Sequence, residues 1–247
     1  MRYLAKVSYD GSRFYGFQRQ PDLRNVQSEL EKALTFLNGG KKSTIVGAGR
    51  TDAGVHALGQ RISFDLNREE DEEELLKGFN HLLPIDIRVL SIKKVDSSFN
   101  ARHSSLKKVY SYHFSWKEVD PFESHYVAYV NNFPFDKNKF IEAMNAFKGR
   151  HKFWNFTSKE SDVGDFIRSI DKIEFEFDDE KGRGLVRLTG DSFMTYQVRM
   201  MVGAALRVSW GKEEVKYIVD KLNSEKRHIS SFKAPAEGLY LEDVFYE

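Results

Sequence analysis

Residue types that could take part in chemistry lie close together in the segment from Gly47 to Gln60, GAGRTDAGVHALGQ. Its four glycines allow positive φ angles and let a ligand approach the backbone closely. Arg50 and Asp52 stand two positions apart within it, and functional groups are often held on such tight loops. A carboxylate there could act as a nucleophile or a base, or Asp52 could only cap the following turn. The residues alone leave both interpretations open.

The glycine-rich segment does not match the phosphate-binding loops of nucleotide enzymes. A dinucleotide-binding fingerprint that begins at Gly47 requires glycine where Asp52 stands. A Walker loop that begins at Gly49 requires lysine and a hydroxyl residue where Val55 and His56 stand. The sequence therefore disfavours nucleotide cofactors and nucleotide hydrolysis.

Other common reactive groups do not occur in the sequence. The 247 residues include no cysteine, which excludes thiolate nucleophiles, disulfides and cysteine-bearing zinc sites. The seven histidines form no HExxH or comparable ligand pair, and no serine lies in a GxSxG elbow. We therefore expect no metal site, and a carboxylate as the reactive group if this chain is an enzyme.

Hydrophobic periodicity predicts the elements that must hold this segment in place. Alternating or short apolar runs predict strands at 2–9, 44–46, 61–66, 87–95, 107–116, 125–130, 170–178 and 184–190. Apolar residues at helical spacing predict helices at 26–37, 72–83, 138–147, 196–208 and 212–222. Both parts of the chain mix strands and helices in similar amounts, so the expected fold class is α+β.

The mixed pattern also predicts two halves, residues 1–104 with the glycine-rich segment and residues 105–247, with a boundary near Ser104. No proline-rich or glycine/serine-rich linker marks this boundary. We therefore expect the halves to share one sheet rather than to move as separate domains.

Charge and hydropathy limit the classes of partner. The formal net charge is only +1, so a nucleic-acid surface would have to be local. Arginine and lysine recur beside aromatic residues in RFYGFQRQ (13–20) and RHSSLKKVY (102–110), although a solvated face is the alternative interpretation. The longest apolar run, Met200–Leu206, is far shorter than the ~20 residues that span a bilayer, so we expect no membrane partner.

Five segments taken together resemble the tRNA pseudouridine synthase A (TruA) family. They are YDGSRFYGFQRQ (9–20), GRTDAGVHA (49–57), KKVYSY (107–112), FMTYQVRMMVG (193–203) and EGLYL (237–241). The resemblance extends over nearly the whole chain, and GRTDAGVHA is a highly specific signature.

The resemblance implies a fold, a reaction and a substrate. The fold is two related halves that form a mostly antiparallel mixed sheet, flanked by helices, with a central active-site cleft. The reaction breaks the bond between uracil N1 and ribose C1′, turns the base and rejoins it through C5, without a cofactor. The implied substrate is uridine at tRNA positions 38 to 40 in the anticodon arm, bound by a cytoplasmic homodimer.

The resemblance also assigns roles to residues of this chain. It implies that Asp52 is the catalytic carboxylate, that Arg199 pairs with it and that Tyr110 packs on the target base. Leu239 is implied to lie against the target uracil. Arg50 is implied to enter the space left by the extruded nucleotide, because chemistry at C1′ and C5 cannot be done inside a stacked stem.

Some positions are less determined by the resemblance. Gln18 and Arg13 are plausible RNA contacts. The family commonly has tryptophan where this chain has Phe17, and a pair of histidines where it has Tyr196 and Gln197. These departures do not touch the implied chemistry, but they could alter RNA contacts.

The alternative function is an RNA-binding or tRNA-folding module in which catalysis is secondary or lost. The presence of Asp52, Tyr110 and Arg199 together argues against that loss. The sequence leaves open whether Asp52 attacks C1′, attacks the uracil ring or acts as a base, because all three need the same carboxylate in nearly the same place.

Overall fold

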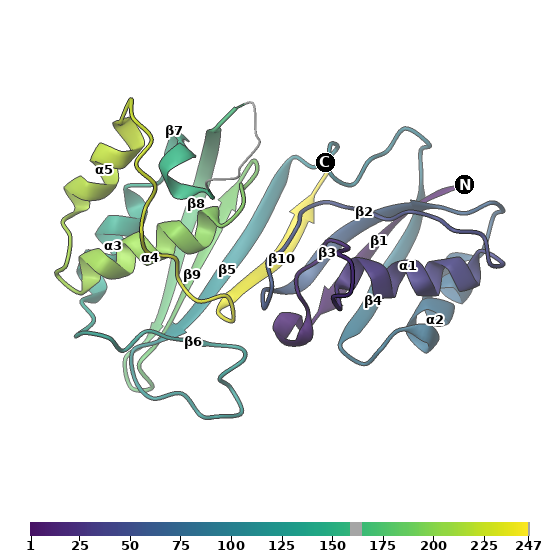
Figure 1. Cartoon of the computed structure of the whole chain (residues 1–247), viewed down its shortest axis with the longest axis horizontal. Coiled ribbons are helices and arrows are strands. Elements are labelled where there is room, and N and C mark those ends of the chain that lie inside the picture. Colours follow the sequence, from purple (N-terminus) through teal and green to yellow (C-terminus); the bar gives the residue numbers. More distant parts are fainter. Residues whose placement is uncertain (159–164, 247) are drawn as a thin grey trace. The chain divides into compact units, whose positions relative to one another are not determined.

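The computed structural model describes residues 1–158 and 165–246. These residues form two compact units (Figure 1). Unit 1 consists of Met1–Leu106 and the segment from Tyr240 onward, and unit 2 consists of Lys107–Leu239. This differs from the expected division into 1–104 and 105–247. The last strand, β10 (Leu239–Phe245), pairs in parallel with β3 (His56–Asp65), so the end of the chain packs with the first unit.

Unit 1 is α+β. Its strands lie in the order β4-β1-β3-β10, and β2 also pairs with β3. Besides β3 and β10 these are β1 (Arg2–Tyr9), β2 (Val46–Gly47) and β4 (Ile87–Val95). All their described pairings are antiparallel except that of β10 with β3. The unit's helices are α1 (Val26–Leu37) and α2 (Glu72–Leu82), and a 3₁₀ turn, η1 (Gly11–Arg13), follows β1.

The helices of unit 1 begin where side chains can accept hydrogen bonds from their first N–H groups. The Asn25 side chain accepts from the Ser28 N–H at the start of α1, and the Asp71 side chain accepts from Glu73 and Glu74 at the start of α2. These capping residues explain why both predicted helix starts agree with the structure.

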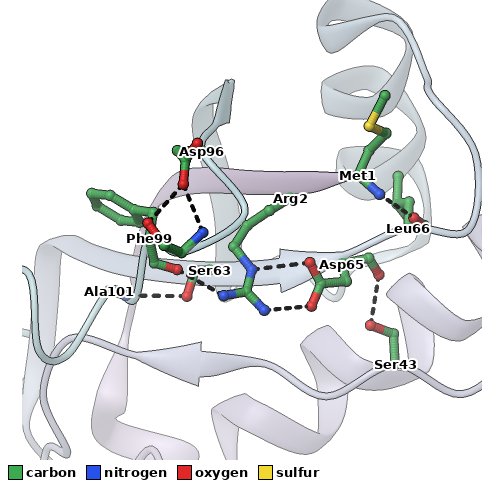
Figure 2. Close-up of polar contacts among 10 residues, drawn as sticks. Met1, Arg2, Ser43, Ser63, Asp65, Leu66, Asp96, Phe99 and Ala101 are labelled. Atoms are coloured by element: carbon green, nitrogen blue, oxygen red, sulfur yellow. Dashed lines mark hydrogen bonds and ion pairs between the residues drawn. The ribbon is translucent and has the colours of Figure 1, made fainter.

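The start of β1 and the end of β3 are tied to each other and to the loop after β4 (Figure 2). Arg2 donates to both carboxylate oxygens of Asp65, at 3.0 and 2.7 Å, and to the carbonyl of Phe99 at 3.0 Å. The hydroxyl of Ser63 accepts from the Ala101 N–H at 3.1 Å. The hydrogen bonds from Arg2 lower the pKa of the Asp65 carboxyl below its usual range.

Unit 2 is α+β as well. Its strands lie in the order β5-β9-β8-β7, and β6 pairs in parallel with β5. They are β5 (Lys107–Ser115), β6 (Ala128–Tyr129), β7 (Gly149–Lys152), β8 (Ile167–Asp178) and β9 (Arg183–Gly190). The other described pairings are antiparallel. The helices are α3 (Lys137–Asn145), α4 (Gln197–Ser209) and α5 (Val215–Asn223), and η2 (Phe153–Phe156) is a 3₁₀ turn after β7.

Aromatic residues fill the space between this sheet and α3. The ring of Phe140 on α3 lies 5.1 Å from that of Phe114 on β5 and 6.4 Å from that of Phe175 on β8, measured between ring centres. α4 packs against α3 and is buried along nearly its whole length. No helix in the described part of the chain has the length and apolar character needed to cross a membrane.

The expected elements occur with shifted ends, and four short or remote ones were missed. The strand expected at 125–130 is only β6, because the N–H groups of Tyr126 and Val127 turn back to the carbonyl of Glu123. η1, β7, η2 and β10 were not predicted. β3 begins at His56 rather than at 61, so the last five residues of the glycine-rich segment are strand and the loop that holds Asp52 is short.

Candidate active site

Asp52 lies on the short loop between β2 and β3 of unit 1. The Ala48 N–H donates to the carbonyl of Arg61 at 2.8 Å where the loop leaves the sheet. The Val55 N–H donates to the carbonyl of Asp52 at 3.2 Å, and Gly54 has a φ of 78°. Glycine is needed there because a left-handed backbone is costly for other residues. The sequence thus makes a tight turn that presents a half-buried carboxylate.

The segment that follows β1 supports this turn on both sides of Asp52. The Phe17 N–H donates to the carbonyl of Thr51 at 3.0 Å, and the Gly54 N–H donates to the carbonyl of Phe14 at 3.3 Å. Phe14 and Phe17 are buried. The backbone around Asp52 is therefore held by main-chain hydrogen bonds to a second loop.

Buried uncharged groups hold the other end of the loop. The Tyr9 hydroxyl lies 2.8 Å from the Thr51 hydroxyl, and the Gln60 amide donates to the carbonyl of Gly49 at 2.8 Å. Burial raises the pKa of Tyr9 to about 12, so this hydroxyl stays neutral at physiological pH. Sequence reasoning missed Tyr9, Thr51 and Gln60 as supports, because only the fold brings β1 and β3 beneath the loop.

The candidate RNA contacts of unit 1 belong to the same two loops. Arg50 donates to the side-chain oxygen of Gln18 at 2.6 Å, and both side chains are exposed. Arg13 is exposed at the end of η1, next to the supporting loop. Arg50, Gln18 and Arg13 therefore lie on the two loops that form the surroundings of Asp52 in unit 1.

In unit 2, Tyr110 stands in β5 opposite Leu188 of β9. Its side chain is buried, and its ring meets the ring of Phe193 edge to face, with centres 5.0 Å apart. Phe193 begins the segment FMTYQVR that leads into α4. The aromatic contact therefore joins the candidate base-packing tyrosine to the segment that carries Arg199.

Arg199 lies in the first turn of α4 and is only 9% exposed. Its Nε donates to the carbonyl of Ala234 at 2.8 Å, and the Ala234 N–H donates back to the carbonyl of Arg199 at 2.9 Å. The bond from Nε holds the side chain, and the backbone bond joins α4 to the segment of Ala234. The resemblance implied Asp52 as the partner of Arg199, and sequence reasoning missed this backbone carbonyl 35 residues later.

Tyr196, the residue before α4, has a strained backbone. Its φ of 64° and ψ of 0° are left-handed, which is rare for a large aromatic residue. Its ring centre lies 3.6 Å from the Lys233 ammonium nitrogen and 5.6 Å from the guanidinium carbon of Arg199. Strain of this kind occurs where the surrounding structure enforces it, often at functional sites. Sequence reasoning noted Tyr196 only as a departure from the family pattern.

Leu239 is buried where unit 2 ends and β10 begins. Its N–H donates to the carbonyl of Ala236 at 2.9 Å, which closes a turn just before the strand. The predicted site residues thus form two groups: Asp52, Arg50, Gln18 and Arg13 on unit 1, and Tyr110, Arg199 and Leu239 on unit 2.

The chain was compared with known proteins. A family model described as "tRNA pseudouridine synthase" matches residues 5–104 and 143–247. A tRNA pseudouridine synthase A from Streptococcus mutans is 38% identical over 250 residues, covering 100% of this chain and 99% of that protein. One from Streptococcus thermophilus is 38% identical over 248 residues, covering 100% of each. A solved structure, "Crystal Structure of a Cbf5-Nop10-Gar1 Complex", aligns with a TM-score of 0.40 at 11% identity, over 97% of this chain and 58% of that one. That likeness is too distant to support an argument.

An α+β protein with a carboxylate on a rigid loop and exposed cations beside it fits the class of RNA-modifying isomerases. The chain belongs to the tRNA pseudouridine synthase family. The family and the type of reaction that the motifs predicted are therefore confirmed.

Proposed function

We propose that this chain converts uridine to pseudouridine in tRNA and that Asp52 is the catalytic carboxylate. The observation that supports this most is the short loop of Asp52, whose backbone is hydrogen-bonded on both sides while its carboxylate is half-buried. A group held in this way can meet one atom of a substrate repeatedly in the same geometry. In the reaction the N1–C1′ bond breaks and a C5–C1′ bond forms. C5 loses a proton and N1 gains one, so the atoms balance without a cofactor.

Arg199 is proposed to orient the Asp52 carboxylate during the reaction. Because Nε is held by the carbonyl of Ala234, a carboxylate would approach the guanidinium from its Nη atoms in a planar two-point contact. Tyr110 and Leu239 are proposed to pack against the uracil ring, a role that their buried aromatic and apolar side chains suit.

The proposed substrate position is the anticodon arm, at tRNA positions 38 to 40, and the proposed assembly is a cytoplasmic homodimer that binds one tRNA across both subunits. Exposed Arg13, Gln18 and Arg50 support RNA contacts beside Asp52. Arg50 is proposed to fill the space left by the extruded nucleotide. A monomeric mass by light scattering that does not change on addition of tRNA would contradict the dimer.

The test is site-resolved detection of pseudouridine in tRNA incubated with the purified protein and with Asp52→Asn. We expect the wild-type protein to modify the anticodon arm, and the variant to bind tRNA with nearly unchanged affinity but form no product. Wild-type turnover by the variant would overturn the role of Asp52. Binding without conversion by the wild-type protein would favour the alternative, an RNA-binding module.

A further inference from the structure

Five cations of unit 2 form a surface that the proposed chemistry does not use. We call them the basic strip: Lys148, Arg150, Lys152, Lys226 and Arg227. All are exposed. Within residues 1–158 and 165–246, none of them forms an ion pair with a carboxylate.

Other lysines of the same unit are neutralised. Lys137 pairs with Asp179 at 2.5 Å, and Lys172 pairs with Glu174 at 2.6 Å. Since the whole chain has a net charge of only +1, a group of unpaired cations makes a local positive surface on a nearly neutral protein.

The fold brings the strip together from two places in the chain. Arg150 and Lys152 stand two positions apart on β7, so their side chains lie on the same face of the sheet. The Arg227 guanidinium donates to the carbonyl of Ser158 at 2.7 Å, which fastens the loop after α5 onto the end of η2. Figure 1 shows β7, β8 and α5 in this part of unit 2.

Two of these cations lie over aromatic rings. The Lys152 ammonium nitrogen is 3.4 Å from the ring centre of Trp154, and the guanidinium carbon of Arg227 is 5.3 Å from that of Phe166. Such contacts limit the movement of long side chains without removing their charge. Less conformational entropy is then lost when an anion binds to them.

The strip continues toward the helix that carries Arg199. Ser158, whose carbonyl accepts from Arg227, donates its own N–H to the carbonyl of Thr195 at 3.3 Å. The hydroxyl of Thr157 donates to the same carbonyl at 2.9 Å. Thr195 precedes strained Tyr196 at the start of α4. An elongated anion bound to the strip could therefore extend along these contacts to the end of α4 that carries Arg199, within unit 2.

We propose that the basic strip binds the ribose-phosphate backbone of the substrate RNA next to the reacting nucleotide, and so sets how the tRNA lies on unit 2. This proposal rests on the proposed tRNA substrate. Cations that contact phosphates supply affinity and orientation, but no base specificity and no chemistry. A different role for cations on an edge strand is protection against edge-to-edge aggregation.

The test replaces Arg150, Lys152 and Lys226 together by glutamine. The matched control replaces exposed Lys41, Lys42 and Lys93 of unit 1 by glutamine, which removes the same charge. We expect the strip variant to raise KM for tRNA about tenfold at low salt with kcat at saturating tRNA unchanged. The dependence of log Kd on log salt concentration should become shallower by about 2 to 3. The control should change both much less.

Equal effects in the two variants, or a strip variant that aggregates while its KM and Kd stay normal, would overturn the proposal. A fall in kcat with unchanged KM would also overturn it. If the wild-type protein forms no pseudouridine, the proposed function fails, and the strip is judged by Kd for tRNA alone. An unchanged Kd then overturns the strip as well.

Discussion

The residues proposed to carry the reaction differ in how they are held. Asp52 is placed by the backbone of its own loop, whereas Arg199 is placed by a hydrogen bond from its Nε to the carbonyl of Ala234. The backbone strain at Tyr196 lies three positions before Arg199. At this scale the sequence names the groups, but their orientation depends on neighbours from distant segments.

Arg199→Lys should keep the positive charge and lose most of the rate. Lysine cannot reproduce a planar two-point contact with a carboxylate or the Nε bond to Ala234. We expect the single-turnover rate at saturating enzyme to fall by about 100-fold or more, with tRNA affinity changed much less. Arg199→Ala is the companion variant. If both variants instead weaken tRNA binding strongly while single-turnover rates stay normal, Arg199 is a phosphate contact.

Tyr196→Gly and Tyr196→Ala should differ in stability although both remove the ring. Only glycine adopts a φ near 64° without strain. The free energy of unfolding, measured in urea, should therefore be about 1 kcal/mol greater for the glycine variant. Both should slow the reaction, because the ring that contacts Lys233 and Arg199 is gone. Equal stability of the two variants would show that the position is not strained.

At the scale of elements, the loop that carries Asp52 depends on the loop after β1. Gly16 has a φ of 91°, and a Cβ there would lie 2.8 Å from the carbonyl oxygen of Thr51. Phe17, the next residue, donates to that same carbonyl. The two loops therefore approach as closely as they do because position 16 has no side chain.

Gly16→Ala should lower both stability and activity. The change combines left-handed strain with a backbone clash, so we expect a loss of about 2 to 3 kcal/mol in the free energy of unfolding. Gly40→Ala is the control, since Gly40 has a φ of 83° but, within the described residues, a Cβ added there would meet no atom within 4 Å. It should lose about 1 kcal/mol and keep its kcat. A normal kcat in Gly16→Ala would mean that loop contact does not position Asp52.

At the scale of the whole molecule, ion pairs join distant parts of the chain. Asp243 on β10 accepts from Lys6 at 2.6 Å and from Arg61 at 3.0 Å. Burial opposes ionisation of Asp243, but hydrogen bonds from Lys6, Val244 and Arg61 outweigh it and lower its pKa. These pairs hold the last strand onto unit 1.

Stability should fall in acid through Asp243 and Asp65. Their pKa values are lower in the folded protein than in the unfolded chain, where aspartate titrates near about 4. Their stabilisation is therefore complete above about pH 5 and is lost as the pH falls through the folded values. Because both side chains are partly exposed, each contributes about 1 kcal/mol or less. Urea unfolding from pH 6 to 3 measures this, and Asp243→Asn should flatten the curve.

Signals between neighbouring residues were enough to predict the family and the starts of two helices from the sequence. The motif around Asp52 identified the family, and capping residues such as Asn25 and Asp71 marked the starts of α1 and α2, because these signals lie within a few neighbouring residues. The family pattern also named Tyr110 and Arg199. Their roles toward the base and toward Asp52 stay predictions.

Contacts between distant segments decided the rest. β10 joins unit 1 through β3, the start of β3 shortens the Asp52 loop, and Ala234 holds Arg199. The basic strip joins the segment 148–152 to Arg227 across more than 70 residues, although charge patterning had pointed to 13–20 and 102–110. Such contacts depend on which segments meet in space. Hydrophobic periodicity within one segment predicts its type of element but not its partner.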